Sequence, residues 1–177
     1  MTEFILIRHT STDVAPGTCC GRSDVPLRPT FLEEAAAVAR RLRGERFDEV
    51  WCSPLSRCVK LADACGYAEA RRDRRLLEID FGEWEMQRFE AIRDPQLQRW
   101  YDNWLHERPT GGESFDEQCA RVAGFLEERR REAPGRRVLI FTHGGVLLAA
   151  GIHAGLFKPE EAFSHTFPYG GELRIAL

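Results

Sequence analysis

Two short apolar runs, each followed two positions later by a histidine, place the strongest constraint on how this chain can fold. The first run is Phe4–Ile7, which precedes His9, and the second is Val138–Phe141, which precedes His143. Unbroken runs rich in Ile, Val, Leu and Phe are typical of strands buried on both faces of a parallel sheet. Because ligands bind beyond the carboxyl ends of such strands, we expect both imidazoles at one site.

This pair of imidazoles has the chemistry that a phosphate-handling site requires. One imidazole can attack phosphorus while the other holds the charged oxygens. Arg8 directly precedes His9, and Arg57 lies near the start of a predicted helix, where the helix N-terminus also attracts anions. Glu78 follows a short predicted strand and is a candidate proton donor. Asp80, Glu83 and Glu85 compete with Glu78 for the role of proton donor, and the spacing of these carboxylates does not decide among them.

Strand and helix patterns alternate along the chain. This order predicts a three-layer α/β/α sandwich with a mostly parallel central sheet, formed by one domain over residues 1–177. Thr30 is expected to cap the first helix, with Glu33 as its reciprocal partner. The predicted strands are Glu3–Arg8, Glu49–Cys52, Arg74–Leu77, Arg137–Phe141 and Glu172–Leu177. The predicted helices are Phe31–Arg43, Ser56–Cys65, Pro95–Glu107, Glu113–Glu132 and Gly145–Leu156.

The stretch around residues 85–112 is too long for a plain connection. We therefore expect a helical insertion that covers the site. This part of the chain and the residues before it are rich in aromatic side chains, which either stack on a flat heterocycle of a substrate or form the core of the insertion. They are Phe81, Trp84, Phe89, Trp100, Tyr101 and Trp104.

Composition excludes several other classes of protein. The net charge is −3, and the arginine clusters are short and interrupted, which argues against a nucleic-acid platform. The sequence shows no signal peptide and no apolar stretch of membrane-spanning length, so a cytoplasmic location is expected. Six cysteines occur without a Cys-x-x-Cys pair or a zinc-binding spacing. We therefore expect neither a metal nor a cofactor.

Four motifs, in order along the chain, resemble the histidine phosphatase superfamily, which has the phosphoglycerate-mutase-like fold. The resemblance covers essentially the whole chain and implies a metal-independent phosphomonoesterase that acts through a phosphohistidine. It implies His9 as nucleophile, Glu78 as acid/base, and Arg8, Arg57 and His143 as the phosphate pocket. The motifs are Arg8-His9-Thr10, Ser53-Pro54-Leu55-Ser56-Arg57, Leu77-Glu78 with Phe81-Gly82-Glu83-Trp84-Glu85, and Thr142-His143-Gly144-Gly145.

Within the superfamily, the chain is most similar to bacterial α-ribazole phosphatases of cobalamin assembly. This similarity implies a small phosphorylated metabolite, α-ribazole 5′-phosphate, as substrate and inorganic phosphate as product. Thr10 stands where most members have glycine, and Ala15 where they have asparagine. The similar stretches are Arg8–Ser11, Gly21–Leu27, Phe81–Glu85 and Gly111–Ser114. The expected substrate-binding residues are Thr10, Ser11, Cys20, Gly21, Trp84 and Gly144.

Two other functions stay open at this point. A phosphoglycerate mutase must shield its intermediate from water, which usually takes a larger enclosing segment than 177 residues provide. A non-catalytic phosphate-binding module is expected to have lost His9, Arg57, Glu78 or His143, and all four are present.

Overall fold

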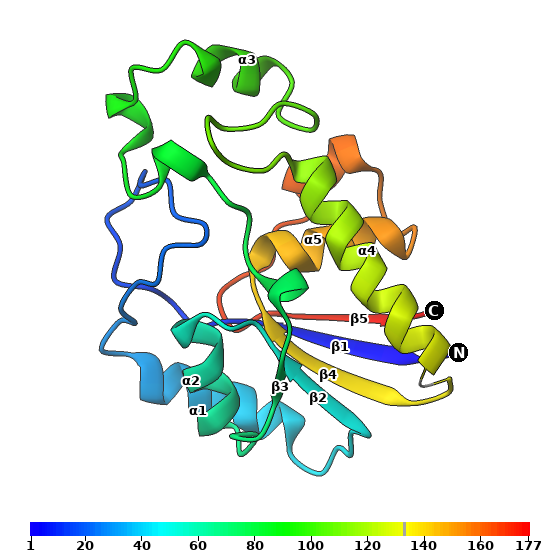
Figure 1. The fold of residues 1–177 in the computed structure, drawn as a ribbon. Helices are drawn as coiled ribbons and strands as arrows, with labels where there is room; N and C mark the ends of the chain where they lie inside the picture. The colour runs from blue at the N-terminus through cyan, green and yellow to red at the C-terminus, as the bar shows by residue number, and fades with distance from the viewer. Residues whose placement is uncertain (133) are drawn as a thin grey trace.

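A five-stranded sheet forms the centre of the molecule (Figure 1). The computed structural model describes residues 1–132 and 134–177. The strands are β1 (Glu3–Arg8), β2 (Glu49–Cys52), β3 (Arg71–Arg72), β4 (Arg137–Thr142) and β5 (Glu172–Ala176). Their order is β3-β2-β4-β1-β5, in which β5 runs antiparallel to β1 and the other neighbours run parallel. The predicted mostly parallel sheet is confirmed.

Helices cover both faces of this sheet (Figure 1). One layer holds α1 (Phe31–Leu42) and α2 (Ser56–Ala64). The opposite layer holds α4 (Phe115–Glu132) and α5 (Gly144–His153). The predicted three-layer α/β/α sandwich is therefore confirmed.

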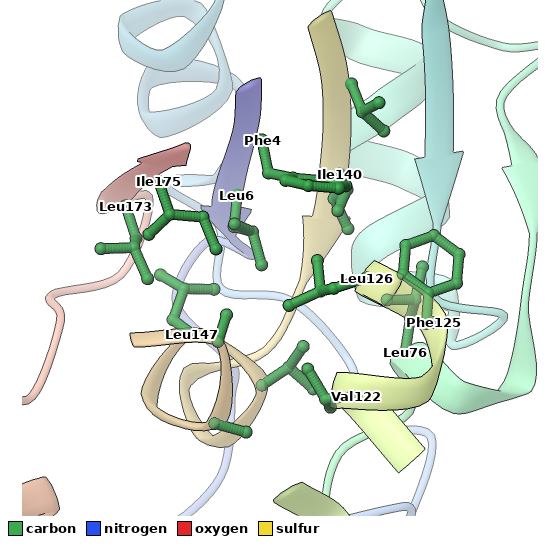
Figure 2. Close-up of a cluster of buried hydrophobic side chains, with 14 residues drawn as sticks. Phe4, Leu6, Leu76, Val122, Phe125, Leu126, Ile140, Leu147, Leu173 and Ile175 are labelled. Atoms are coloured by element: carbon green, nitrogen blue, oxygen red, sulfur yellow. The ribbon is translucent and has the colours of Figure 1, made fainter. Parts of the chain in front are cut away.

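The side chains of β1 show why its sequence is apolar without interruption. Phe4 and Leu6 pack into the layer formed by α4 and α5 (Figure 2), whereas Ile5 and Ile7 pack against α1 and α2. All four side chains are fully buried. A strand covered on both faces has no solvent-facing positions, so the alternation of polar and apolar residues disappears.

One predicted strand is wrong. Arg74–Leu76 forms a 3-10 turn, and the edge strand β3 consists of Arg71–Arg72 instead. Asp73 ends the extended backbone, because its Oδ1 accepts a hydrogen bond from the Arg75 backbone N–H at 2.8 Å and starts the turn.

The predicted capping box of the first helix is also wrong. Thr30 is the N-cap residue, but its side chain makes no capping hydrogen bond. Thr30 Oγ1 instead donates to Glu34 Oε1 at 2.7 Å, and Glu34 also accepts from the backbone N–H and the hydroxyl of Ser11. Glu34, rather than Glu33, thus ties the start of α1 to the loop after β1.

The segment between the third strand and α4 lies apart from the sheet, at the top of Figure 1. Its helix α3 spans Gln96–Asp102 and is shorter than the predicted Pro95–Glu107, because Asn103 leaves the helical conformation (φ −151°, ψ 53°). The segment has a small core of Trp84 and Ile92, which also includes Cys19 from the loop after β1. Among the described residues, no helix is both long and apolar enough to cross a membrane.

Candidate active site

The register of the sheet brings the two histidines together. Arg8 of β1 is opposite Thr142 of β4, so the next residue of each strand leaves the sheet at the same edge. The His9 backbone N–H donates to the Thr142 carbonyl at 3.0 Å. The imidazole centroids of His9 and His143 lie 5.2 Å apart. The structure therefore brings both predicted imidazoles to the carboxyl ends of the parallel strands.

His9 is neutral, and its proton lies on Nδ1. Its Nδ1 lies 2.7 Å from the Thr10 carbonyl. Because only an N–H can donate to a carbonyl, Nδ1 carries the proton and Nε2 keeps its lone pair. Burial, Arg57 and Arg8 together lower the pKa of His9 from 6.5 to about 3. A neutral nitrogen with a lone pair can act as a nucleophile.

His143 is the N-cap residue of α5 and is completely buried. The Ser53 hydroxyl and His143 Nε2 share a hydrogen bond of 2.7 Å. Burial, His9 and Arg57 hold the pKa of His143 well below its usual range, so this imidazole is also neutral. Sequence reasoning gave Ser53 no role, although its position directly after β2 was a signal.

The Arg8 guanidinium lies beside His9 and is covered by an aromatic ring. Its Cζ stands 4.1 Å from the centroid of the Tyr169 ring, a cation–π arrangement. A Cβ on Gly144 would lie only 3.2 Å from Arg8 Nε, so glycine there lets the guanidinium approach α5. Tyr169 also lies near His9, with ring centroids 5.7 Å apart. The turn before β5 thus contributes a wall of the site that the sequence did not predict.

Arg57 holds the loop after β1 by hydrogen bonds, and its charge acts on both histidines. Its side chain is fully buried between α2 and that loop, and its two terminal nitrogens donate to the carbonyls of Ser23 (2.7 Å) and Gly21 (2.6 Å). A Cβ on Gly21 would lie 1.9 Å from the Ile79 carbonyl oxygen, so the loop can pass there only with glycine. Arg57 therefore fixes the loop while its charge stays close to His9.

Glu78 is distinguished from the three competing carboxylates by its position. Glu85 accepts hydrogen bonds from four backbone N–H groups and is committed to the loop. Asp80 pairs with Arg22, and Glu83 is exposed. Glu78, in contrast, lines the two cavities of the site.

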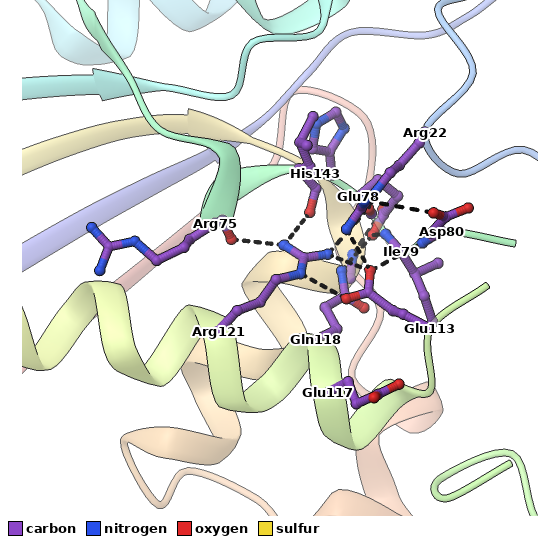
Figure 3. A network of polar contacts seen from close by, with 12 residues as sticks. Arg22, Arg75, Glu78, Ile79, Asp80, Glu113, Glu117, Gln118, Arg121 and His143 are labelled. Carbon is purple, nitrogen blue, oxygen red and sulfur yellow. Dashed lines mark hydrogen bonds and ion pairs between the residues drawn. The ribbon is translucent and has the colours of Figure 1, made fainter. Parts of the chain in front are cut away.

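A network around Arg121 of α4 holds the backbone that carries Glu78 (Figure 3). Its guanidinium donates to the carbonyls of Leu77 (2.6 Å) and Glu78 (3.1 Å) and pairs with both oxygens of Glu113 at 2.8 Å. Arg22 reaches the same Glu113 carboxylate from the loop after β1 at 3.1 Å. Sequence reasoning missed Arg121, because the pattern of its own helix does not indicate these contacts.

Two cavities meet at the reaction centre. A polar cavity of about 230 Å³ is lined by His9, Arg57 and Tyr169 together with residues of the loop after β1. A larger cavity of about 350 Å³ has mainly apolar walls, and Arg8 and Glu78 are its charged lining residues. Its aromatic walls are Phe81, Phe89, Trp100, Trp104, Phe115, Phe163 and Phe167. Arg8, Cys20 and Glu78 line both cavities, so a phosphate in the first would place its ester group toward the second.

The expected substrate-binding residues occupy different places. Cys20 lines both cavities and Gly144 lines the apolar one. Thr10 is fully buried and contributes its carbonyl to His9, whereas Ser11 is hydrogen-bonded to Glu34. The Gly21 carbonyl accepts a hydrogen bond from Arg57.

Trp84 belongs to the small core of the segment between β3 and α4. It is 1% exposed, and its Nε1 donates to Asp94 Oδ2 at 2.9 Å. Phe81 and Trp100, which pack against the same core, line the apolar cavity instead. Trp84, which we expect from the sequence to bind substrate, does not line this cavity, and these two rings do. Among the described residues, no group of three or more His, Cys, Asp or Glu could hold a metal ion.

Comparison with known proteins identifies one family. The sequence model of the histidine phosphatase superfamily (branch 1) matches residues 4–171. An Escherichia coli protein named adenosylcobalamin/alpha-ribazole phosphatase is 30% identical over 167 residues, which cover 90% of this chain and 82% of that protein. Phosphoserine phosphatase 1 of Hydrogenobacter thermophilus is 30% identical over 151 residues, which cover 81% of this chain and 71% of the relative.

Solved structures agree with this result. The structure of the alpha-ribazole phosphatase from Shigella flexneri superposes with a TM-score of 0.88 at 26% sequence identity. The superposition covers 99% of this chain and 90% of the other. The resemblance inferred from the four motifs is confirmed.

Proposed function

Since the chain is a phosphatase that belongs to the histidine phosphatase superfamily, we propose that it hydrolyses a small phosphate monoester whose alcohol carries a flat apolar group. The observation that carries the proposal is the junction of the two cavities. His9 and Arg57 line the polar cavity, aromatic rings line the other, and Glu78 lies at both.

We assign the chemical steps to the residues at this junction. His9 Nε2 attacks phosphorus, the P–O bond to the alcohol breaks, and Glu78 donates a proton to the departing oxygen. Arg8 and Arg57 stabilise the phosphoryl oxygens in the ground state and in the transition state. Contact of His143 with the phosphate stays a prediction, because this buried imidazole lines neither cavity and its Nε2 is hydrogen-bonded to Ser53. Water then attacks phosphorus, the P–N bond to His9 Nε2 breaks, Glu78 takes a proton from that water, and inorganic phosphate leaves. The Nδ1–carbonyl contact of His9 supports this assignment, because it leaves Nε2 as the reactive nitrogen.

The walls of the larger cavity favour α-ribazole 5′-phosphate over phosphoserine as substrate. Besides its phosphate, phosphoserine carries an ammonium and a carboxylate, which need charged partners in the leaving-group region. The charged lining residues there are Arg8 and Glu78, which the phosphate and the proton transfer already use. A flat heterocycle, in contrast, can stack against the aromatic walls.

Phosphate release from a substrate panel tests the proposal. We expect kcat/KM for α-ribazole 5′-phosphate to exceed that for phosphoserine by roughly 10²-fold, which corresponds to about 3 kcal/mol. Phe163→Ala removes a half-exposed wall of the apolar cavity and should reduce that preference. Leu32→Ala, an exposed apolar residue on α1, is the control and should leave it unchanged. A preference for phosphoserine would contradict the proposed substrate class.

A further inference from the structure

We propose that Gln118 is a positioning residue for Glu78, and that its amide determines which carboxylate oxygen exchanges the proton with the leaving group. The inference rests on the proposed function, because it concerns the acid–base step at the same site. Gln118 lies on α4, on the buried side of the helix that also carries Phe115 and Val122.

The hydrogen bonds to Glu78 are divided unequally between its two oxygens. Gln118 Nε2 donates to Oε1 at 2.8 Å, and the Ile79 backbone N–H donates to the same oxygen at 2.9 Å. Oε2 accepts from the Gly145 backbone N–H at 3.1 Å. Because a carboxylate oxygen can accept about two hydrogen bonds, Oε1 is filled and Oε2 retains a lone pair. The oxygen left free for proton exchange is thus Oε2.

The Gln118 amide is confined on both sides. Figure 3 shows it beside the Glu78 carboxylate, at the end of α4 that faces the site. A Cβ built on Gly145 would lie 2.9 Å from Gln118 Nε2 and 3.0 Å from its Oε1, so the first turn of α5 packs directly against the amide. An amide held between two elements can fix the carboxylate in one orientation.

The fold gains little from a glutamine at this position. Gln118 is 0% exposed, and its Oε1 has no hydrogen-bond partner among the described residues. A buried acceptor without a donor destabilises a protein, and an apolar side chain would suit this helix face better. A residue that opposes stability while it contacts the acid–base group is expected of a functional site rather than of a core.

The test replaces Gln118 by methionine, which has a similar length and no hydrogen-bonding group at its end. We expect kcat for α-ribazole 5′-phosphate to fall roughly 10- to 100-fold, because a misoriented carboxylate transfers the proton poorly. The kcat for p-nitrophenyl phosphate should fall much less, since its leaving group needs little protonation. The KM values and the melting temperature should stay at or near the wild-type values.

Two further variants keep the test decisive. Gln118→Asn retains an amide but is one methylene too short to reach Glu78, so it should show the same selective loss. Gln98→Met is the matched control, because the exposed Gln98 amide donates to the Asp102 carboxylate at 2.9 Å on helix α3. It should keep wild-type turnover of both substrates.

Several results would overturn the inference. Equal losses on both substrates with a lowered melting temperature would show that Gln118 only supports the structure. Unchanged turnover of both substrates in Gln118→Met and Gln118→Asn would show that it has no role. A wild-type protein that releases no phosphate from either substrate would contradict the proposed function itself, and is thereby distinguished from failure of this inference alone.

Discussion

Replacement of Gly145 by alanine tests the position of Glu78 with a single methyl group. Gly145 lies in the first turn of α5, and its N–H donates to Glu78 Oε2. A Cβ at this position would stand 2.3 Å from Glu78 Oε1, whereas ordinary contacts begin near 3.4 Å. The carboxylate therefore has to move by about 1 Å to make room.

A displacement of that size is large for a group that transfers a proton. Misplacement by about 1 Å can cost about 10²-fold in rate, so we expect kcat for α-ribazole 5′-phosphate to fall by about that factor. Turnover of p-nitrophenyl phosphate should fall much less. Alanine is favoured over glycine in a helix by about 0.5–1 kcal/mol, which offsets part of the steric cost and keeps the protein folded. Steady-state phosphate release and thermal unfolding measure both effects.

Gly124→Ala is the matched control for this substitution. Gly124 lies in α4, and a Cβ there would meet nothing within 4 Å. The variant should keep wild-type kinetics and gain about 2–4 °C in melting temperature. Wild-type turnover of α-ribazole 5′-phosphate by Gly145→Ala would refute the placement of Glu78 in the proton transfer, as would equal losses on the alkyl and aryl substrates.

Three further predictions follow from the geometry. Glu78→Gln removes the proposed proton donor and should slow α-ribazole 5′-phosphate roughly 10²-fold or more, with a smaller effect on p-nitrophenyl phosphate; comparable losses in kcat would reopen the choice of carboxylate. Arg57→Lys keeps a charge but loses the planar fork, so inhibition by vanadate should weaken roughly tenfold, and an unchanged inhibition constant would exclude a phosphate-binding role. The pKa of His9 is lowered to about 3 in the folded protein, so the unfolded chain binds the proton first as the pH falls below 6.5. The contribution of His9 to the free energy of unfolding is therefore complete above pH 6.5 and is lost as the pH falls toward 3. Chemical denaturation over this pH range should show a shallower loss of stability for His9→Gln than for the wild type. An equally steep loss would show that His9 is not buried as a neutral ring.

Local pattern is sufficient to predict the centre of this site. The histidines follow strands whose burial on both faces is visible as unbroken apolar runs, and the strand register then brings them together. Arg57 lies on the helix that follows β2, within a motif that the family shares. The position of these residues depends mainly on the sheet, which the sequence pattern describes well.

The remaining site residues depend on packing between distant segments. Gln118 and Arg121 act through contacts with residues 77 and 78, about forty positions away, and nothing in their own helix pattern specifies those contacts. The sequence places Tyr169 in a Gly-rich turn but does not show that the turn covers Arg8. The sequence likewise does not decide between a ligand contact and core packing for Trp84, because both favour aromatic residues.

Direct detection of phosphohistidine is the most direct test of the central claim, that His9 carries the phosphoryl group during turnover. The wild-type protein would be mixed with substrate, quenched in alkali within its first turnover, and digested for mass spectrometry at high pH. We expect one phosphorylated peptide with the group on His9, stable in alkali and lost in mild acid, and no such peptide from His9→Ala. Phosphate on another residue, or a His9→Ala variant that still forms the intermediate and turns over normally, would contradict the account.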